Sequence, residues 1–261
     1  MSQTTASQNT ANRTPAGRTT ASRGTLLGLF SSDCLKLKRT MALPLAILGP
    51  FGVVALTALN YGLRYDYLYK LYEGKHWSAL ISNTIFLSFL ALLLGMSLLA
   101  SQLAGREHQT HAWKQTLALP VSRLSVYTAK FLLLILLLSF SCLLLFGGTW
   151  LLGGLLGFGW EAPLAQLAIK SFYPLPAGLA CLALQYGLSV AFRNQAIAMS
   201  VGVLGVVIGM YSISLPDFII WKLPLLENNA GYPEWSVVAG TLLGVVLFTA
   251  WSLHFVRKDV N

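Results

Sequence analysis

The chain has 261 residues, of which 55% are hydrophobic and only 10% charged, and its formal net charge is +9 at pH 7. Soluble domains carry about 25% charged residues, so this composition excludes an ordinary water-soluble protein. Three cysteines do not form a disulfide framework, and we expect Cys142 and Cys181 to be buried free thiols because both lie in apolar segments.

Six long segments without Asp, Glu, Lys or Arg follow one another along the chain. A helix needs about 20 apolar residues to cross the hydrocarbon core of a bilayer, and the shortest of the six has 22 residues. We therefore predict an all-α polytopic membrane protein in which residues 40–261 form a six-span transmembrane domain. The six segments are residues 40–63, 76–105, 131–160, 171–192, 194–216 and 235–256.

The basic residues are distributed unevenly between the two sides of such a domain. With six spans, both chain ends, residues 105–130 and Arg193 lie on the same side. That side holds thirteen of the 18 basic residues and three acidic ones, whereas the other side holds five basic and six acidic residues. Because Lys and Arg are enriched in cytoplasmic loops, we predict that both termini are cytoplasmic.

The region before the first span divides into two parts. Residues 1–24 contain no acidic residue and, apart from Met1, no large hydrophobic one. This composition predicts a disordered cytoplasmic tail, with an Arg-rich transit peptide as the weaker alternative. Residues 25–39 place hydrophobic side chains at helical spacing and predict an interfacial connecting helix. Its cations at the membrane surface are Lys36, Lys38 and Arg39.

Glycine and proline spacings predict how the spans pack. Three Gly-x-x-x-Gly pairs favour close approach of helices: Gly153 and Gly157, Gly205 and Gly209, Gly240 and Gly244. Prolines in the first halves of spans one and four predict kinks or re-entrant starts at Pro44, Pro50, Pro174 and Pro176.

The chemistry of several function classes is missing from the sequence. There is no Gly-x-x-x-x-Gly-Lys-Ser/Thr motif for a nucleotide, so we expect no cofactor bound by the chain itself. No ionisable residue lies deep in a predicted span, which argues against an ion-coupled carrier and an intramembrane enzyme. His108 and His111 could share a helical face, but without further ligands they do not predict a metal site.

The segment between spans two and three is the most informative one. Trp113 and Leu117 are four residues apart and predict a short amphipathic helix, which Pro120 ends. Ser122 can cap a new helix that continues into span three. The simpler alternative is a polar loop with snorkelling cations. On the new helix the spacing places three residues on one face at the membrane surface: Arg123, Tyr127 and Lys130.

The two outer loops contain further patterns. Six aromatic residues crowd the first loop and favour an interfacial aromatic belt, with a peptide- or lipid-binding patch as the alternative. They are Tyr61, Tyr65, Tyr67, Tyr69, Tyr72 and Trp77. In residues 215–235, three prolines surround an apolar run, which predicts a short re-entrant or lid-like element.

Two segments resemble those of ABC-2 type permeases. The stretch Glu107…Trp113-Lys114…Leu119-Pro120-Val-Ser-Arg123…Tyr127…Lys130 is similar to their cytoplasmic loop, Glu-x-x-x-Gly-Thr-Trp-Lys followed by Leu-Pro-x-Ser-Arg and Tyr-x-x-Lys. Asp33-Cys-Leu-Lys-Leu-Lys-Arg-Thr40 resembles the Glu-Leu-Lys-Lys-Arg-type segment before their first span. Within the group, the chain most resembles the small permeases of lantibiotic-immunity and bacitracin-type peptide exporters. His111-Ala112 departs from the Gly-Thr of the family pattern.

The resemblance implies a permease subunit in a bacterial cell membrane. A separate ABC ATPase would bind ATP, and a second permease subunit, identical or related, would complete the pathway for an antimicrobial peptide or other amphipathic substrate. The helix around Trp113 would be a cytoplasmic coupling helix. The expected ATPase contacts are Arg106, Glu107, Trp113, Lys114, Leu117, Pro120 and Arg123, with Tyr127 and Lys130 at the membrane interface and no role for nucleic acid. An ATP-independent membrane sensor or assembly subunit is the alternative function.

Overall fold

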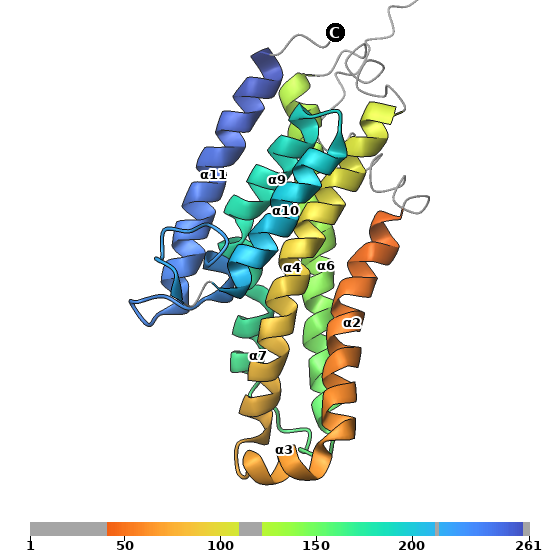
Figure 1. The fold of residues 1–261 in the computed structure, drawn as a ribbon, viewed down its shortest axis with the longest axis vertical. Helices are drawn as coiled ribbons and strands as arrows, with labels where there is room; N and C mark the ends of the chain where they lie inside the picture. The colour runs from red at the N-terminus through yellow and green to blue at the C-terminus, as the bar shows by residue number, and fades with distance from the viewer. Residues whose placement is uncertain (1–40, 110–121, 212–213, 258–261) are drawn as a thin grey trace, which may run out of the picture.

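The computed structural model describes residues 41–109, 122–211 and 214–257. Every regular element within these ranges is a helix (Figure 1), which confirms the all-α prediction. The predicted tail at 1–24, the interfacial helix at 25–39 and the coupling helix around Trp113 lie outside the described residues.

Four helices are long and apolar enough to cross a membrane: α2 (Ala42–Leu63), α4 (His76–Gln109), α6 (Arg123–Leu155) and α11 (Pro233–Arg257). At 1.5 Å per residue, the 34 residues of α4 extend about 51 Å, well beyond the ~30 Å hydrocarbon core. The short helix α3 (Tyr65–Leu71) joins α2 to α4 at the end of the bundle opposite the C-terminal end of α11 (Figure 1). We call these the α3 end and the loop end.

The fourth predicted span is broken. Residues 164–191 form α7 (Leu164–Phe172), α8 (Pro174–Ala177) and α9 (Leu179–Ala191), and the chain bends by 41° between Ala177 and Leu179. Pro174 and Pro176 lack the N–H group that a continuous helix needs, so the predicted kink is confirmed here. Helix α2, in contrast, continues through Pro50 without a break.

The helix in the fifth predicted span is too short to cross the hydrocarbon core by itself. Helix α10 (Gln195–Met210) has 16 residues and extends about 24 Å, less than the hydrocarbon core. The described residues therefore hold four spanning helices, or five when the broken helix counts as one, and the sixth crossing stays a prediction. After α10 the chain returns through the short helix η2 (Leu223–Leu225), which contacts α4, α8 and α11.

Helix α4 occupies the centre, where it contacts α2, α6, α9 and α10. Its buried face carries Phe89 and Met96, which belong to one continuous apolar core. Helix α11 packs closely on the broken helix, because Gly240 lies against Ala177 and a Cβ on Gly244 would meet the Leu179 Cβ at 2.8 Å.

The glycine prediction is thus confirmed for the pair in α11. Gly205 lies against Trp221 and Gly209 against Phe89, so the pair in α10 also allows close contacts. Gly157 differs, since it follows α6 in a turn with φ +81° and contributes a backbone conformation rather than a helix contact.

Candidate functional site

The loop end of the bundle places α4 and α6 on either side of residues 110–121. Helix α6 begins where the sequence predicts, because the Ser122 Oγ accepts a hydrogen bond from the Ser125 N–H at 3.0 Å. Such a side-chain cap satisfies one of the free N–H groups of the first helical turn. The direction in which the chain enters α6 is therefore fixed locally.

An ion pair joins α4 to α6 just below this point. The Lys130 Nζ lies 2.7 Å from the Glu107 Oε1, and the two side chains are only 8% and 18% exposed. Two opposite charges so far from water are stable only as a pair, because removing one leaves the other uncompensated. The pair therefore ties together the two helix ends that flank residues 110–121.

One turn before Lys130, Tyr127 lies in an aromatic cluster. Its ring is 4.6 Å from that of Tyr186 in α9 and 5.4 Å from each of Phe248 and Phe255 in α11. The Tyr186 Oη donates a hydrogen bond to the Tyr127 carbonyl at 3.1 Å. Three helices are thereby held together at the loop end.

The structure places Tyr127 and Lys130 differently from the sequence interpretation. Their spacing suggested a face of α6 at the membrane surface, whereas both side chains are buried inside the protein. The reason is that aromatic residues of α9 and α11 cover Tyr127, while Lys130 pairs with Glu107 of α4. Arg123 is half-buried, and its Nη1 donates to the Val256 carbonyl at 3.4 Å, while Arg106 is exposed near the end of α4. The depth of these residues in a membrane stays a prediction.

The other predicted contacts with an ATPase, and the cations of the predicted interfacial helix, lie outside the described residues. They are Trp113, Lys114, Leu117 and Pro120, and Lys36, Lys38 and Arg39. Their roles stay predictions.

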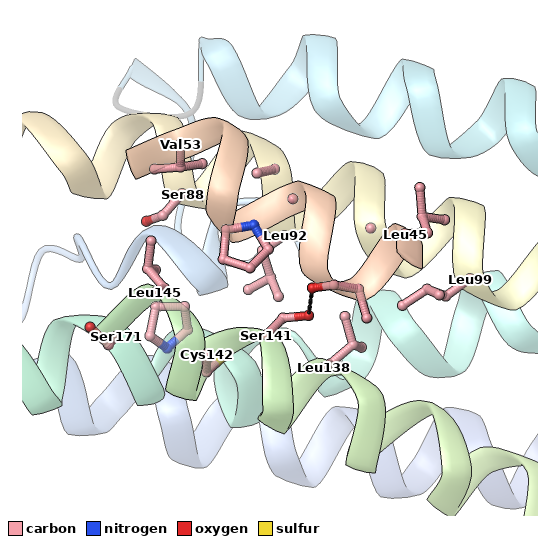
Figure 2. Close-up of a pocket in the computed structure, with 16 residues that line it drawn as sticks. Leu45, Val53, Ser88, Leu92, Leu99, Leu138, Ser141, Cys142, Leu145 and Ser171 are labelled. Atoms are coloured by element: carbon pink, nitrogen blue, oxygen red, sulfur yellow. Dashed lines mark hydrogen bonds between the residues drawn. The ribbon is translucent and has the colours of Figure 1, made fainter. Parts of the chain in front are cut away.

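A long apolar cavity, which we call the slot, lies between α2, α4 and α6 (Figure 2). It encloses about 520 Å³, including its open mouth. Its walls are almost entirely hydrophobic, and Pro174 of α8 lies at its margin. Figure 2 also shows Ser141, whose Oγ donates to the Ala46 carbonyl at 2.6 Å and so connects α6 to α2. The slot is not among the features predicted from the sequence, although Gly49 and Gly95, which lie in apolar segments and line it, are the signal that could have indicated it.

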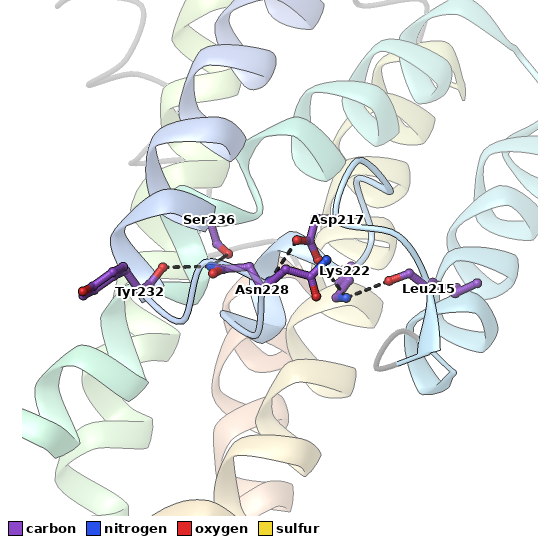
Figure 3. A network of polar contacts seen from close by, with 7 residues as sticks. Leu215, Asp217, Lys222, Asn228, Tyr232 and Ser236 are labelled. Carbon is purple, nitrogen blue, oxygen red and sulfur yellow. Dashed lines mark hydrogen bonds and ion pairs between the residues drawn. The ribbon is translucent and has the colours of Figure 1, made fainter.

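The connection between α10 and α11 is held by a polar network (Figure 3). The Lys222 Nζ lies 2.7 Å from the Leu215 carbonyl and 2.9 Å from the Asp217 Oδ1, and the Asn229 N–H donates to the Asp217 Oδ2 at 2.9 Å. The Asn229 N–H and, secondly, Lys222 hold the pKa of Asp217 below its ordinary value. Asn228 then connects the loop to α11 by donating to the Ser236 Oγ at 2.9 Å.

The network gives the predicted lid-like element a definite structure. The element packs inward, since the Cys181 Sγ of α9 contacts the Ile220 carbonyl at 3.2 Å. Cys181 and Cys142 are both buried free thiols, as predicted. Among the described residues, no group of three or more His, Cys, Asp or Glu side chains could hold a metal ion.

The aromatic residues at the α3 end form a packed group. Tyr69 stacks on His76 with ring centroids 4.3 Å apart, and His76 stacks on Phe158 at 5.1 Å. Tyr61 is buried, and its Oη accepts a hydrogen bond from Asn83 at 3.2 Å. Several of the predicted belt residues thus hold the two loops at the α3 end against each other.

A family model described as ABC-2 family transporter protein matches residues 29–212. The match covers more than half of the chain and extends from the region before α2 through α10. Searches of curated proteins and of solved structures gave no match.

Proposed function

The chain belongs to the ABC-2 transporter family, and from this premise we propose that it works with a separate ATPase subunit to move an amphipathic substrate across a bacterial cell membrane. As a member of this family it is a permease subunit, a transporter component that is not itself catalytic. An antimicrobial peptide is the substrate class that we propose, with ATP bound by the partner.

The observation that carries this proposal beyond the family is the arrangement at the loop end. Residues 110–121 connect two helices of 34 and 33 residues that extend through the whole bundle. The Glu107–Lys130 ion pair ties these helices together directly below the loop. A partner that displaces the loop would therefore move α4 and α6 as a unit, which supports a role for this loop in coupling ATP hydrolysis to transport.

We assign separate roles to the loop residues. Trp113 and Leu117 are apolar anchors in a groove of the ATPase, Pro120 ends their helix, and polar contacts come from Arg106, Lys114 and Arg123. For Glu107 we propose a positioning role in place of a direct ATPase contact, because its carboxylate contacts Lys130. It is a positioning residue for the coupling loop.

The complete assembly follows from the same premise. We propose six crossings, with both termini cytoplasmic, where α10 and the residues after Met210 complete the fifth. Residues 25–39 lie along the cytoplasmic surface with Lys36, Lys38 and Arg39 at the lipid headgroups. A second permease subunit, identical or related, completes the substrate pathway.

The test is copurification with an ABC ATPase expressed together with this chain, combined with substrate-stimulated ATP hydrolysis and cellular resistance. Truncating a central interfacial Trp costs about 2 kcal/mol, so Trp113→Ala is expected to weaken the complex about 30-fold. Arg123→Ala is expected to leave a folded protein that transports poorly, whereas Glu107→Ala is expected to lose stability together with transport because it breaks the buried pair. Trp150→Ala is the matched control, because Trp150 is partly exposed on α6 far from the loop end.

If the double variant Trp113→Ala/Arg123→Ala keeps full complex formation and full transport, the loop is not the coupling element. Failure of the wild-type chain to bind any ATPase would favour an ATP-independent sensor or assembly subunit instead.

A further inference from the structure

The slot continues toward the α3 end of the bundle. A second cavity, which we call the head cavity and which has room for about one water molecule, shares Ser88, Leu145 and Ser171 with the slot. The head cavity lies between α4, α6 and α7 and adds Thr149 and Lys170 to the lining. The apolar slot and the more polar head cavity therefore adjoin at these three residues.

The head cavity holds polar groups that the protein does not use. Thr149 is 1% exposed, and its Oγ1 has no hydrogen-bond partner among the described residues. An unpaired buried hydroxyl of this kind is uncommon in native structures. Lys170 is half-buried, and no hydrogen bond or ion pair links it to another residue in the described ranges. A hydroxyl and a cation thus line the same small space, which suits a single oxygen atom of an anionic group.

The slot has the dimensions of a hydrocarbon chain. A Cβ on Gly49 would meet nothing within 4 Å, and one on Gly95 would meet only the Leu138 Cδ2 at 3.9 Å, so missing side chains create its width. Along α4 the slot extends from Ser88 to Leu99, which is about 16 Å of helix. This length is about half of the ~30 Å hydrocarbon core, the share of a single leaflet.

We propose that the slot and the head cavity together bind an anionic membrane lipid from the leaflet at the α3 end. One acyl chain lies in the slot between α2, α4 and α6. Lys170 faces the negative charge of the headgroup, and Thr149 and Ser171 supply hydroxyl groups for its oxygens. The site goes beyond the proposed function, since it is formed by one chain and needs neither an ATPase nor a transported substrate.

The experiment uses the full chain in phosphatidylcholine nanodiscs that contain a little phosphatidylglycerol with a photoreactive diazirine on one acyl chain. After illumination, peptide mass spectrometry gives the labelling of slot residues relative to exposed Leu56 and Leu59 on α2. The same photoreactive chain on phosphatidylcholine measures the headgroup preference. A lysine near a lipid surface contributes about fivefold in affinity for an anionic lipid, so we expect a preference of about fivefold for phosphatidylglycerol.

Variants test each half of the site separately. Gly49→Leu fills the slot and is expected to abolish slot labelling, whereas Gly52→Leu, on the same helix but outside the slot lining, is expected to keep it. Both positions have open space, so both variants are expected to fold. Lys170→Gln is expected to remove the headgroup preference while slot labelling continues, and Lys170→Arg to retain both.

Slot labelling no higher than that of Leu56 and Leu59, or equal loss in Gly49→Leu and Gly52→Leu, would overturn the acyl-chain site. Equal labelling by the two lipids, or a preference that Lys170→Gln leaves unchanged, would overturn the anionic headgroup site. None of these results depends on an ATPase, so failure here is distinguishable from failure of the proposed function.

Discussion

The Glu107 carboxylate and the Lys130 ammonium are a pair of charges in a place where isolated charges are costly. Both lie at the loop end, in helix turns that α9 and α11 help to cover, and their side chains are largely inaccessible to water. Charged groups in such positions are retained when they are paired, and the pairing fixes the register of the two helices. Here the register that is fixed is that of α4 against α6, next to the proposed coupling loop.

Removing one partner is therefore expected to destabilise the protein more than removing both. Glu107→Leu removes the carboxylate partner of the buried Lys130 ammonium, whereas Glu107→Leu/Lys130→Met replaces both charges by apolar groups. In a double-mutant cycle, we expect a coupling energy of about 1–2 kcal/mol between the two positions. The measurement is reversible unfolding in mixed micelles, with Lys70→Met at the exposed α3 end as the control substitution. Strictly additive effects would show that the pair contributes nothing to the register.

At the scale of helices, the charge-free segments predicted the long helices well, because a membrane-spanning helix needs little more than length and apolar composition. The break at Pro174 also follows from local chemistry, since proline cannot continue the backbone hydrogen bonds. The burial of Lys130 could not be predicted from its own helix, because it depends on Glu107, 23 residues away. The opposite charges at the two ends of one short connection are the signal that could have indicated the pair.

The slot was missed for a related reason. Its walls come from three helices, and its width depends on glycines that leave space rather than on side chains that fill it. A glycine in an apolar segment predicts close helix contact equally well, and Gly240 and Gly244 show that outcome. Sequence alone does not distinguish a glycine that admits a helix from one that leaves a cavity.

The connection between α10 and α11 offers a test by pH. The Asn229 N–H and Lys222 stabilise the charged form of Asp217, so the pKa of Asp217 is lower in the folded loop than in an unfolded one. A carboxylate with a depressed pKa stabilises the fold above its ordinary pKa, and this contribution is lost as the pH falls through the folded value. We therefore expect the loop to stay closed at pH 7 and to loosen only below about pH 4.

The measurement is deuterium exchange of residues 214–232 between pH 7 and pH 3, corrected for the intrinsic pH dependence of exchange. Asp217→Asn is expected to raise exchange already at pH 7 and to remove the step in acid. Glu227→Gln is the matched control, since Glu227 is exposed in the same loop. An identical acid transition in Asp217→Asn and in wild type would exclude Asp217 as its cause.

At the scale of the whole molecule, the lengths of the helices and the distribution of charged residues must fit the same arrangement in the membrane. Helix α10 extends only about 24 Å, so a crossing there is complete only if the residues after Met210 supply the remainder. The connection around η2 packs inward against the protein. It is compatible with a fifth crossing, because irregular backbone is tolerated at membrane depth when protein covers it. The unequal distribution of Lys and Arg predicts that the loop end lies in the cytoplasm.

Labelling of single cysteines in intact cells tests both the orientation and the sixth crossing. Lys70→Cys in α3 and Asn229→Cys in the connection are exposed positions that we expect a membrane-impermeant maleimide to modify from outside. Gln109→Cys, exposed at the end of α4, is expected to react only after the membrane is permeabilised. The background variant carries Cys34→Ser, and the buried Cys142 and Cys181 remain in place. Modification of position 109 in intact cells would reverse the orientation. A second outcome concerns α10: position 70 is modified in intact cells, but position 229 only after permeabilisation. The connection would then lie on the cytoplasmic side, and α10 would not complete a crossing.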